Sequence, residues 1–224
     1  MTRILIHVEG QTEETFVKTL LAPHLFGHGF SRVDARLLGN ARARSRRGGI
    51  RDWQVASREI ERHLKEDGEA YASIMVDYYA LPRTWPGRNC DTALPIETKH
   101  RTLCEALAQD FEEKTGIIER FIPFVLMHEF EALLFADCQR FAEAIGYEDK
   151  QPALQGIRDT FETSEHINDS PQTAPSKRVI NIINGYDKVL FGNVAAVEVG
   201  LASIRADCRL FDQWVRRLEA LPSQ

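Results

Sequence analysis

The chain has 224 residues, a net charge of −5 and a hydrophobic content of 43%. This length suits one domain, or one domain with a modest extension, and the apolar content is enough for a sizeable core. The sequence shows no apolar run of transmembrane length and no basic-then-apolar leader, so we expect neither a membrane partner nor secretion. The negative charge argues against adhesion of the whole surface to nucleic acid.

The four cysteines are widely scattered. They form neither paired metal-ligand spacing nor a compact disulfide framework. This pattern indicates a reduced, cytoplasmic protein.

The first predicted element is a strand at residues 4–8, an apolar run that is typical of a strand buried on both faces. Gly10 permits a sharp exit from it, and Thr12 with the following glutamates favours a helix over about 14–25. A weaker strand is predicted at 31–37.

Acidic residues follow the first strand directly. A carboxylate at the carboxyl end of such a strand, here Glu9, lies where open α/β sheets bind ligands. Burying Glu9 and Glu13 there without cations would be costly, which suggests a divalent metal. The alternative is that Glu9 is a solvated turn residue and that Glu13 and Glu14 only favour the helix dipole.

The next stretch is basic and rich in glycine. Its arginines are Arg36, Arg42, Arg44, Arg46, Arg47 and Arg51. A flexible basic loop beside an acidic site is suited to contact a phosphate backbone. The alternative is a solvated run of charge.

Strands and helices then alternate. We predict a helix from Trp53 to about Glu66, a strand at 72–76 that ends on Asp77, a proline-rich loop, a helix at 98–115, a strand at Phe121–Leu126 and a helix beginning at 130–135. From about residue 137 onward the segments look helical, at 153–161, 176–183, 194–208 and 210–221. The pattern indicates a parallel sheet of about four strands flanked by helices, as residues 1–136, followed by a helical extension, residues 137–224, packed on that core.

An acidic residue follows the carboxyl end of each of three predicted strands. Glu9, Asp77 and Glu129 each follow a predicted strand, and in parallel neighbours they emerge at one edge of the sheet. Two or three carboxylates make a sufficient Mg²⁺ site, because this ion retains several waters. Glu13, one turn into the first helix, can lean over the same edge.

The acids of the 128–135 segment leave two possibilities. In a helix, Glu129 and Glu131 would point in nearly opposite directions, whereas His128 and Glu131 would share a face. If the helix starts only at Phe130, Glu129 belongs to the strand end and joins the other acids. We favour Glu129 as a ligand, with Glu131 as the alternative.

The sequence lacks the motifs for zinc binding and for binding the phosphates of a nucleotide. No cysteine-histidine cluster has zinc spacing. No phosphate-cradling glycine loop follows the first strand. The chain is therefore not predicted to be an autonomous ATPase or a dinucleotide enzyme.

The segment at residues 6–13 resembles the first motif of the Toprim fold of topoisomerases, bacterial primases and overcoming-lysogenisation-defect nucleases. More closely, the entire chain resembles the bacterial domain of unknown function 4276 family. Four blocks carry this match: 8–13, 76–82, 128–135, and 173–178 with 185–188.

The Toprim resemblance implies that Glu9 is a metal ligand or general acid-base and that Asp77 opens the Asp-x-Asp motif for Mg²⁺ or Mn²⁺. The place of the second Asp is taken by Tyr79, which weakens the case for two metals unless Glu129 or Glu131 replaces it.

The 173–178 block adds Lys177 and Arg178 to the first turn of a helix that Pro175 can start. Cations oppose the helix dipole there, which suggests a use in gripping phosphate, or a salt-bridged or solvated pair. Our candidate residues are thus Glu9, Glu13, Asp77 and Lys177 for catalysis, Glu9, Asp77, Glu129 and Glu131 for metal, and Arg42, Arg44, Arg46, Arg47 and Arg178 for nucleic acid.

The sequence and the resemblance together predict a Mg²⁺-dependent nuclease or phosphoryl-transfer enzyme acting on DNA or RNA. By analogy with this group it would serve as the effector of a phage-defence system, beside a separate ATPase and with a possible homo-oligomer. The alternatives are a non-catalytic Toprim-like scaffold that binds nucleic acid or a partner ATPase, and a small-molecule phosphatase.

Overall fold

The computed structural model describes residues 1–39, 52–90, 93–167 and 173–223. Its centre is a parallel sheet with the strand order β2-β1-β3-β4. The strands are β1 (Thr2–Val8), β2 (Phe30–Leu37), β3 (Ala70–Asp77) and β4 (Phe121–Leu126). Val8 pairs with Met75, and Asp77 pairs with Leu126, so the carboxyl ends of neighbouring strands meet at one edge. The predicted α/β class with a four-stranded parallel sheet is confirmed.

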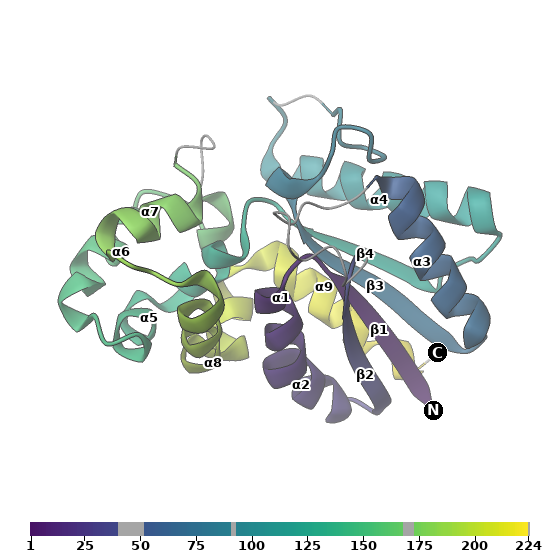
Figure 1. Ribbon diagram of the computed structural model, residues 1–224, viewed down its shortest axis with the longest axis horizontal. Coiled ribbons are helices and arrows are strands. Elements are labelled where there is room, and N and C mark those ends of the chain that lie inside the picture. Colours follow the sequence, from purple (N-terminus) through teal and green to yellow (C-terminus); the bar gives the residue numbers. More distant parts are fainter. Residues whose placement is uncertain (40–51, 91–92, 168–172, 224) are drawn as a thin grey trace.

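Helices cover both faces of the sheet, which is why the central strands are apolar throughout. On one face, Trp214 of α9 (Arg209–Glu219) stacks on Phe124 with ring centroids 4.7 Å apart. Its indole Nε1 also donates a hydrogen bond to Ser73 Oγ at 3.1 Å. On the opposite face, Trp53 of α3 (Trp53–Glu66) lies 6.1 Å from the ring of Phe121 (Figure 1).

Helix α4 (Ile96–Thr115) runs beside β4, and its Phe111 ring packs 4.8 Å from Phe121. The helix ends at Gly116, whose φ of 69° is the left-handed conformation that glycine adopts without strain. The short 3₁₀ segment η3 (Tyr78–Ala80) and a turn-rich loop connect β3 to α4.

The remaining helices gather on the side of the molecule away from α3 and α4 (Figure 1). Beyond Asp137 no strand occurs in the described residues, as the sequence predicts. These elements are η4 (Phe130–Asp137), α5 (Cys138–Ala144), η5 (Glu148–Lys150), α6 (Gln151–Arg158), η6 (Ser164–His166), α7 (Pro175–Ile182) and α8 (Lys188–Asp207). The short η7 (Leu221–Ser223) follows α9 at the C-terminus, which lies near the N-terminus instead (Figure 1).

Two of the predicted helices differ clearly in extent from the helices of the structure. The single helix expected at 14–25 is three consecutive pieces, α1 (Gln11–Phe16), the π-helical η1 (Val17–Leu21) and α2 (Ala22–Phe26). Pro23 lacks a backbone N–H, so the regular ladder cannot pass through it, and a widened turn precedes it. Helix α8 starts at Lys188 rather than at residue 194, because the Asp187 carboxylate caps it by accepting two backbone N–H bonds.

Helix α8 is long and apolar enough to cross a membrane by length and composition alone, although Asn193 and Glu198 interrupt its apolar run. One side packs on α1, α5 and η4, while Val189, Leu190, Val194 and Val197 are exposed. The backbone breaks from helical geometry at Gly200, where φ is 78°. One helix of this kind is weak evidence for a membrane segment.

Candidate functional site

Glu9 and Asp77 meet at the carboxyl edge of the sheet, as predicted. Glu9 is the first residue after β1, and Asp77 is the last residue of β3. The backbone N–H of Asp77 donates a hydrogen bond to Glu9 Oε2 at 3.3 Å. Asp77 Oδ1 is buried and has no hydrogen-bond partner, so this edge presents a carboxylate oxygen that no described group satisfies.

Glu13 leans over the same edge, also as predicted. Its Oε2 accepts the backbone N–H of Gly10 at 2.9 Å, and the side chain is only 6% exposed. A Cβ at Gly10 would lie 2.9 Å from that oxygen, so a larger residue there would push the carboxylate away. The sequence Glu-Gly-x-x-Glu thus folds the helix start onto the strand end and buries the acid that follows.

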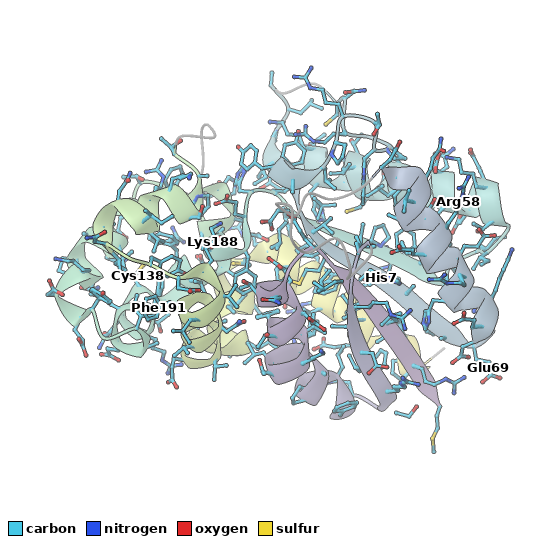
Figure 2. The ribbon with its side chains drawn as sticks, in the orientation of Figure 1. His7, Arg58, Glu69, Cys138, Lys188 and Phe191 are labelled. Atoms are coloured by element: carbon cyan, nitrogen blue, oxygen red, sulfur yellow. The ribbon has the colours of Figure 1, made fainter. Side chains whose placement is uncertain are left out.

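Glu129 and Glu131 both reach this region, and Lys188 lies between them. Lys188 Nζ is 3.8 Å from Glu129 Oε1 and 3.3 Å from Glu131 Oε1. Figure 2 shows Lys188 at the N-terminal end of α8. Glu129 Oε2 also accepts the backbone N–H of Ser176 at the start of α7, at 2.9 Å.

Of the two possibilities for this segment, the structure adopts the favoured one, in which the helix starts only at Phe130 and Glu129 belongs to the strand end; Glu129 and Glu131 then share one cation. Glu129 has extended φ and ψ angles of −140° and 160°, and η4 is a 3₁₀ helix rather than an α-helix. The helical spacing rule does not apply to a residue that precedes the helix. The two acids face one ammonium group, which shows that they can face one ion.

The carboxyl groups of this cluster hold their protons unusually tightly. Burial, with repulsion from Glu13, raises the pKa of Glu9 to about 7. Burial and the charges of Glu13 and Glu9 raise the pKa of Asp77 well above its ordinary value. Burial also raises the pKa of Glu13 and Glu131. These shifts mean that the cluster contains more acid than its described neighbours neutralise.

Lys188 is the cation that the cluster does contain. Burial lowers its pKa, but Glu131 and Glu129 outweigh this effect and raise the pKa overall. The ammonium group therefore stays charged. Sequence reasoning did not select Lys188, although the 185–188 block of the family resemblance includes it.

The basic residues predicted from the 173–178 block lie differently. Lys177 is exposed on α7. Arg178 donates from Nε to the carbonyl oxygen of Thr173 at 2.8 Å, and its guanidinium lies 5.1 Å from the Phe161 ring centroid. The part of this block that touches the acids is the Ser176 N–H, at the N-terminus of α7.

Two aromatic residues border the acids. Tyr79, which stands where the Toprim motif has its second Asp, stacks on His128 with ring centroids 5.7 Å apart. Burial lowers the pKa of His128 to about 4, so this ring is neutral at pH 7. The Tyr186 hydroxyl is buried without a partner, and burial and Glu131 raise its pKa.

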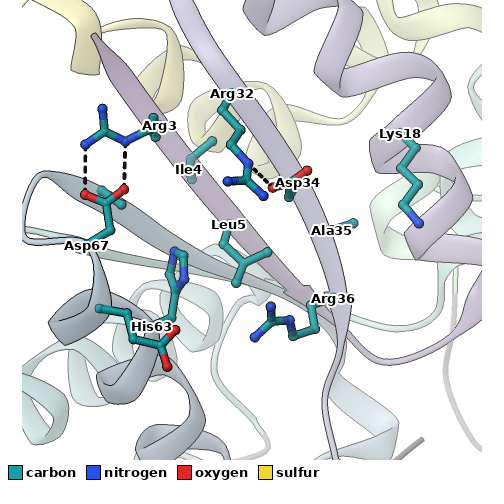
Figure 3. Close-up of a pocket in the computed structure, with 12 residues that line it drawn as sticks. Arg3, Ile4, Leu5, Lys18, Arg32, Asp34, Ala35, Arg36, His63 and Asp67 are labelled. Carbon is teal, nitrogen blue, oxygen red and sulfur yellow. Dashed lines mark hydrogen bonds and ion pairs between the residues drawn. The ribbon is translucent and has the colours of Figure 1, made fainter.

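The arginine-rich stretch is only partly described. Arg42, Arg44, Arg46 and Arg47 lie outside the described residues. Arg36 lines a cavity of about 500 Å³ between β2 and α3 (Figure 3). Arg3 and Arg32 in this cavity pair with Asp67 and Asp34, at 2.7 Å and 2.5 Å, whereas Arg36 has no ion pair within the described part of the chain.

The acidic edge offers hard oxygen donors, which suit Mg²⁺ or Mn²⁺ rather than softer ions. Its ligand atoms do not converge to within 4.8 Å of one another in any group of three; among the residues that the structure describes, the group that does so is His24, His28 and Glu219. Mg²⁺ needs only one or two protein carboxylates with several waters, so the edge fits it without such convergence.

Comparison with known families assigns the chain. The model of a domain of unknown function, DUF4276, matches residues 8–219. The chain belongs to the DUF4276 family. The resemblance found in the sequence is thereby confirmed for this family, and the match spans the acidic edge, Lys188 and both flanking groups of helices.

Solved structures similar to this DUF4276 chain come from the C-terminal region of the Xanthomonas campestris pv. campestris OLD protein. The iodine-phased structure shares 16% identity with a TM-score of 0.45, covering 100% of this chain and 98% of that chain. The platinum-phased structure shares 18% identity with a TM-score of 0.43, covering 99% and 96%. This likeness is too distant to transfer a property. No curated protein matches the chain.

Proposed function

We propose that the acidic edge binds Mg²⁺ or Mn²⁺ and that the chain is a metal-dependent nuclease or phosphoryl-transfer enzyme acting on nucleic acid. The observation that carries this proposal is Asp77, whose buried Oδ1 has no partner beside Glu9. A buried, unsatisfied carboxylate among other acids is costly unless a cation or a proton joins it. A divalent ion satisfies this cluster at neutral pH.

In this proposal Glu9 and Asp77 are the principal ligands, and Glu129, just before η4, and Glu131, within η4, lie nearby. A bound ion would polarise a phosphoryl oxygen and lower the pKa of water. The alternative role of Glu9 is that of a general acid-base, which exchanges a proton with the attacking water or the leaving group. Tyr79 supplies no carboxylate, so we propose a single metal.

Lys188 has a defined place in this scheme. Its side chain is 44% exposed, so the ammonium group lies at the border between the acids and solvent. A cation there can pair with an incoming phosphate after a metal has taken over the charge of Glu129 and Glu131. We therefore propose Lys188, rather than Lys177, as the lysine that contacts the substrate.

The second candidate is a non-catalytic scaffold that binds nucleic acid or an ATPase partner. The observation in its favour is the same Lys188, which already neutralises two of the acids. If this ion pair is permanent, the edge needs no metal. The two proposals therefore differ in whether the chain binds a divalent ion.

The test is a cleavage assay on single- and double-stranded DNA and RNA, with Mg²⁺, Mn²⁺ or EDTA. We expect metal-dependent cleavage that Glu9→Gln and Asp77→Asn each abolish, since each change removes charge and keeps shape. Glu14→Gln is the matched control, because Glu14 lies beside Glu13 but pairs with Lys18 at 2.6 Å. Cleavage at the wild-type rate in both site variants would refute the assignment.

The resemblance also suggests that the chain works beside a separate ATPase in phage defence. Co-purification with an ATPase encoded by a neighbouring gene would support this role. If such an ATPase is co-expressed and the two proteins elute separately, the partnership is excluded for that pair.

A further inference from the structure

Three ligand-type side chains meet on a part of the molecule that the acidic edge does not include. They are His24 of α2, His28 just after α2, and Glu219 at the last residue of α9. His24 Nε2 lies 2.6 Å from Glu219 Oε1, and His28 Nε2 lies 3.7 Å from the same oxygen. The ligand atoms of all three lie within 4.8 Å of one another.

The backbone sets the orientation of the His28 ring. His28 Nδ1 lies 3.0 Å from the carbonyl oxygen of His24. A carbonyl only accepts hydrogen bonds, so Nδ1 carries a proton, and in the neutral ring Nε2 then keeps its lone pair. That lone pair faces a carboxylate oxygen, and either a proton on Nε2 or a cation between the two atoms satisfies both. Metal-binding histidines are oriented by such a bond from the other ring nitrogen.

We propose that His24, His28 and Glu219 bind a divalent transition ion, for which Zn²⁺ is the probe. Two imidazoles and one carboxylate are a three-ligand zinc set that leaves a fourth position for water. At zinc-ligand distances of about 2.0–2.1 Å, tetrahedral ligand atoms lie roughly 3.3 Å apart. The observed 2.6 Å and 3.7 Å separations lie on either side of this value, so small side-chain movements suffice.

Arg205 competes for the same carboxylate. Its Nη1 bonds Glu219 Oε1 and lies 3.2 Å from His24 Nε2. An entering ion would displace Nη1 from Oε1. Arg205 would still hold Glu219 Oε2 through Nη2, at 3.2 Å, and Asp212 Oδ1 through Nε, at 2.6 Å. The guanidinium therefore remains satisfied when the ion is bound.

The site is open to solvent, since the side chains of His24, His28 and Glu219 are 26%, 41% and 17% exposed. His24 and Glu219 lie 195 positions apart in the chain, so they are brought together only by folding. An ion bound here would join α2 to α9 and stabilise the folded state by mass action. The proposed role of the ion is to crosslink α2, near the N-terminus, to α9, near the C-terminus.

The experiment is calorimetric titration with Zn²⁺ of the full chain carrying Glu9→Gln and Asp77→Asn, so that the acidic edge contributes little. We expect one Zn²⁺ per chain, unaffected by excess Mg²⁺ because imidazole ligands select against Mg²⁺. Adding His28→Ala should weaken Zn²⁺ binding at least tenfold. This half-exposed side chain contributes little to folding, which circular dichroism of the variant verifies.

The matched control is His166→Ala. His166 Nε2 lies 3.5 Å from Glu97 Oε1, and His166 does not belong to the group formed by His24, His28 and Glu219, so Zn²⁺ affinity should not change. Titration with Co²⁺ in place of Zn²⁺ provides a second readout. The visible absorption of Co²⁺ should change when the histidine nitrogens bind it, and this change should be lost with His28→Ala. Absence of Zn²⁺ binding, or equal affinity with and without His28, overturns the proposal. Neither result bears on Mg²⁺ at the acidic edge.

Discussion

Asp77 donates its backbone N–H to Glu9 Oε2 at 3.3 Å, so the acids that end two neighbouring parallel strands lie against each other. This bond orients Glu9 but leaves Asp77 Oδ1 without a partner. Burial and repulsion from Glu13 raise the pKa of both groups, which means that the metal-free edge holds protons at neutral pH. A divalent ion would replace those protons.

The pKa of Glu9 makes the stability of the metal-free protein pH-dependent. Its pKa rises from 4.5 unfolded to about 7 folded, so deprotonation costs stability as pH rises between these values. Glu9→Gln removes this cost. The free energy of unfolding of Glu9→Gln, relative to wild type, should increase from pH 4.5 to 7 and then level off, by on the order of 3 kcal/mol in all. Denaturant unfolding in EDTA measures the difference; a pH-independent difference contradicts the shift.

Lys188 should stabilise the folded protein through Glu131. Lys188→Met leaves Glu131, which is 2% exposed, without its counter-charge. Because Lys188 itself is 44% exposed, solvent screening reduces the effect, and we expect a loss of about 1–2 kcal/mol at pH 7. Adding Glu131→Gln should recover part of the loss. Lys150→Met, which removes an exposed pair with Asp149, is the control and should change stability by less than about 0.5 kcal/mol.

Trp214 should contribute to stability without affecting the site. Trp214→Phe keeps most of the stacking on Phe124 but removes the indole bond to Ser73 Oγ, costing about 1 kcal/mol. Trp214→Ala should cost about 3–5 kcal/mol because it empties a packed position. Chemical denaturation measures both values. Equal losses in the two variants would show that ring packing on the sheet contributes nothing.

The arginine-rich stretch remains a predicted phosphate contact. Replacing Arg44 and Arg46 by Ala should weaken nucleic-acid binding and lower the log-log salt slope by roughly two units on duplex DNA. Arg209→Ala with Arg216→Ala on α9 removes the same charge from exposed positions and should leave the slope nearly unchanged. A filter-binding series across salt concentrations compares them. An equal slope in the two double variants rejects the contact.

Much of the fold is predictable because local patterns specify it. Phe121–Leu126 is an unbroken apolar run and forms a strand with those bounds, and Trp53–Glu66 forms a helix as its periodicity indicates. Helix α5 was not predicted, because Cys138–Ala144 is too short for a periodic signal. Its N-cap, Asp137, accepts the Arg140 N–H, a signal that could have located it.

Some residues of the candidate site could likewise be predicted from the sequence, and others could not. Glu9 and Asp77 were predictable because each ends an apolar strand, and strand ends share an edge. Lys188 was not, since its contact with Glu131 spans 57 positions and depends on how α8 packs against η4. No local sequence pattern predicts how α8 packs against η4. The pairing of Glu129 with Glu131 on one cation depends on the helix starting at Phe130, which is the possibility favoured from the sequence.

The most direct test is titration of the metal-free protein with Mn²⁺, in which electron paramagnetic resonance measures the concentration of the free ion. We predict that wild type and Glu14→Gln bind Mn²⁺ with equal affinity and that Asp77→Asn weakens binding at least tenfold while its unfolding midpoint in EDTA is preserved or raised. If Asp77→Asn binds Mn²⁺ as tightly as wild type, the acidic edge is not a metal site.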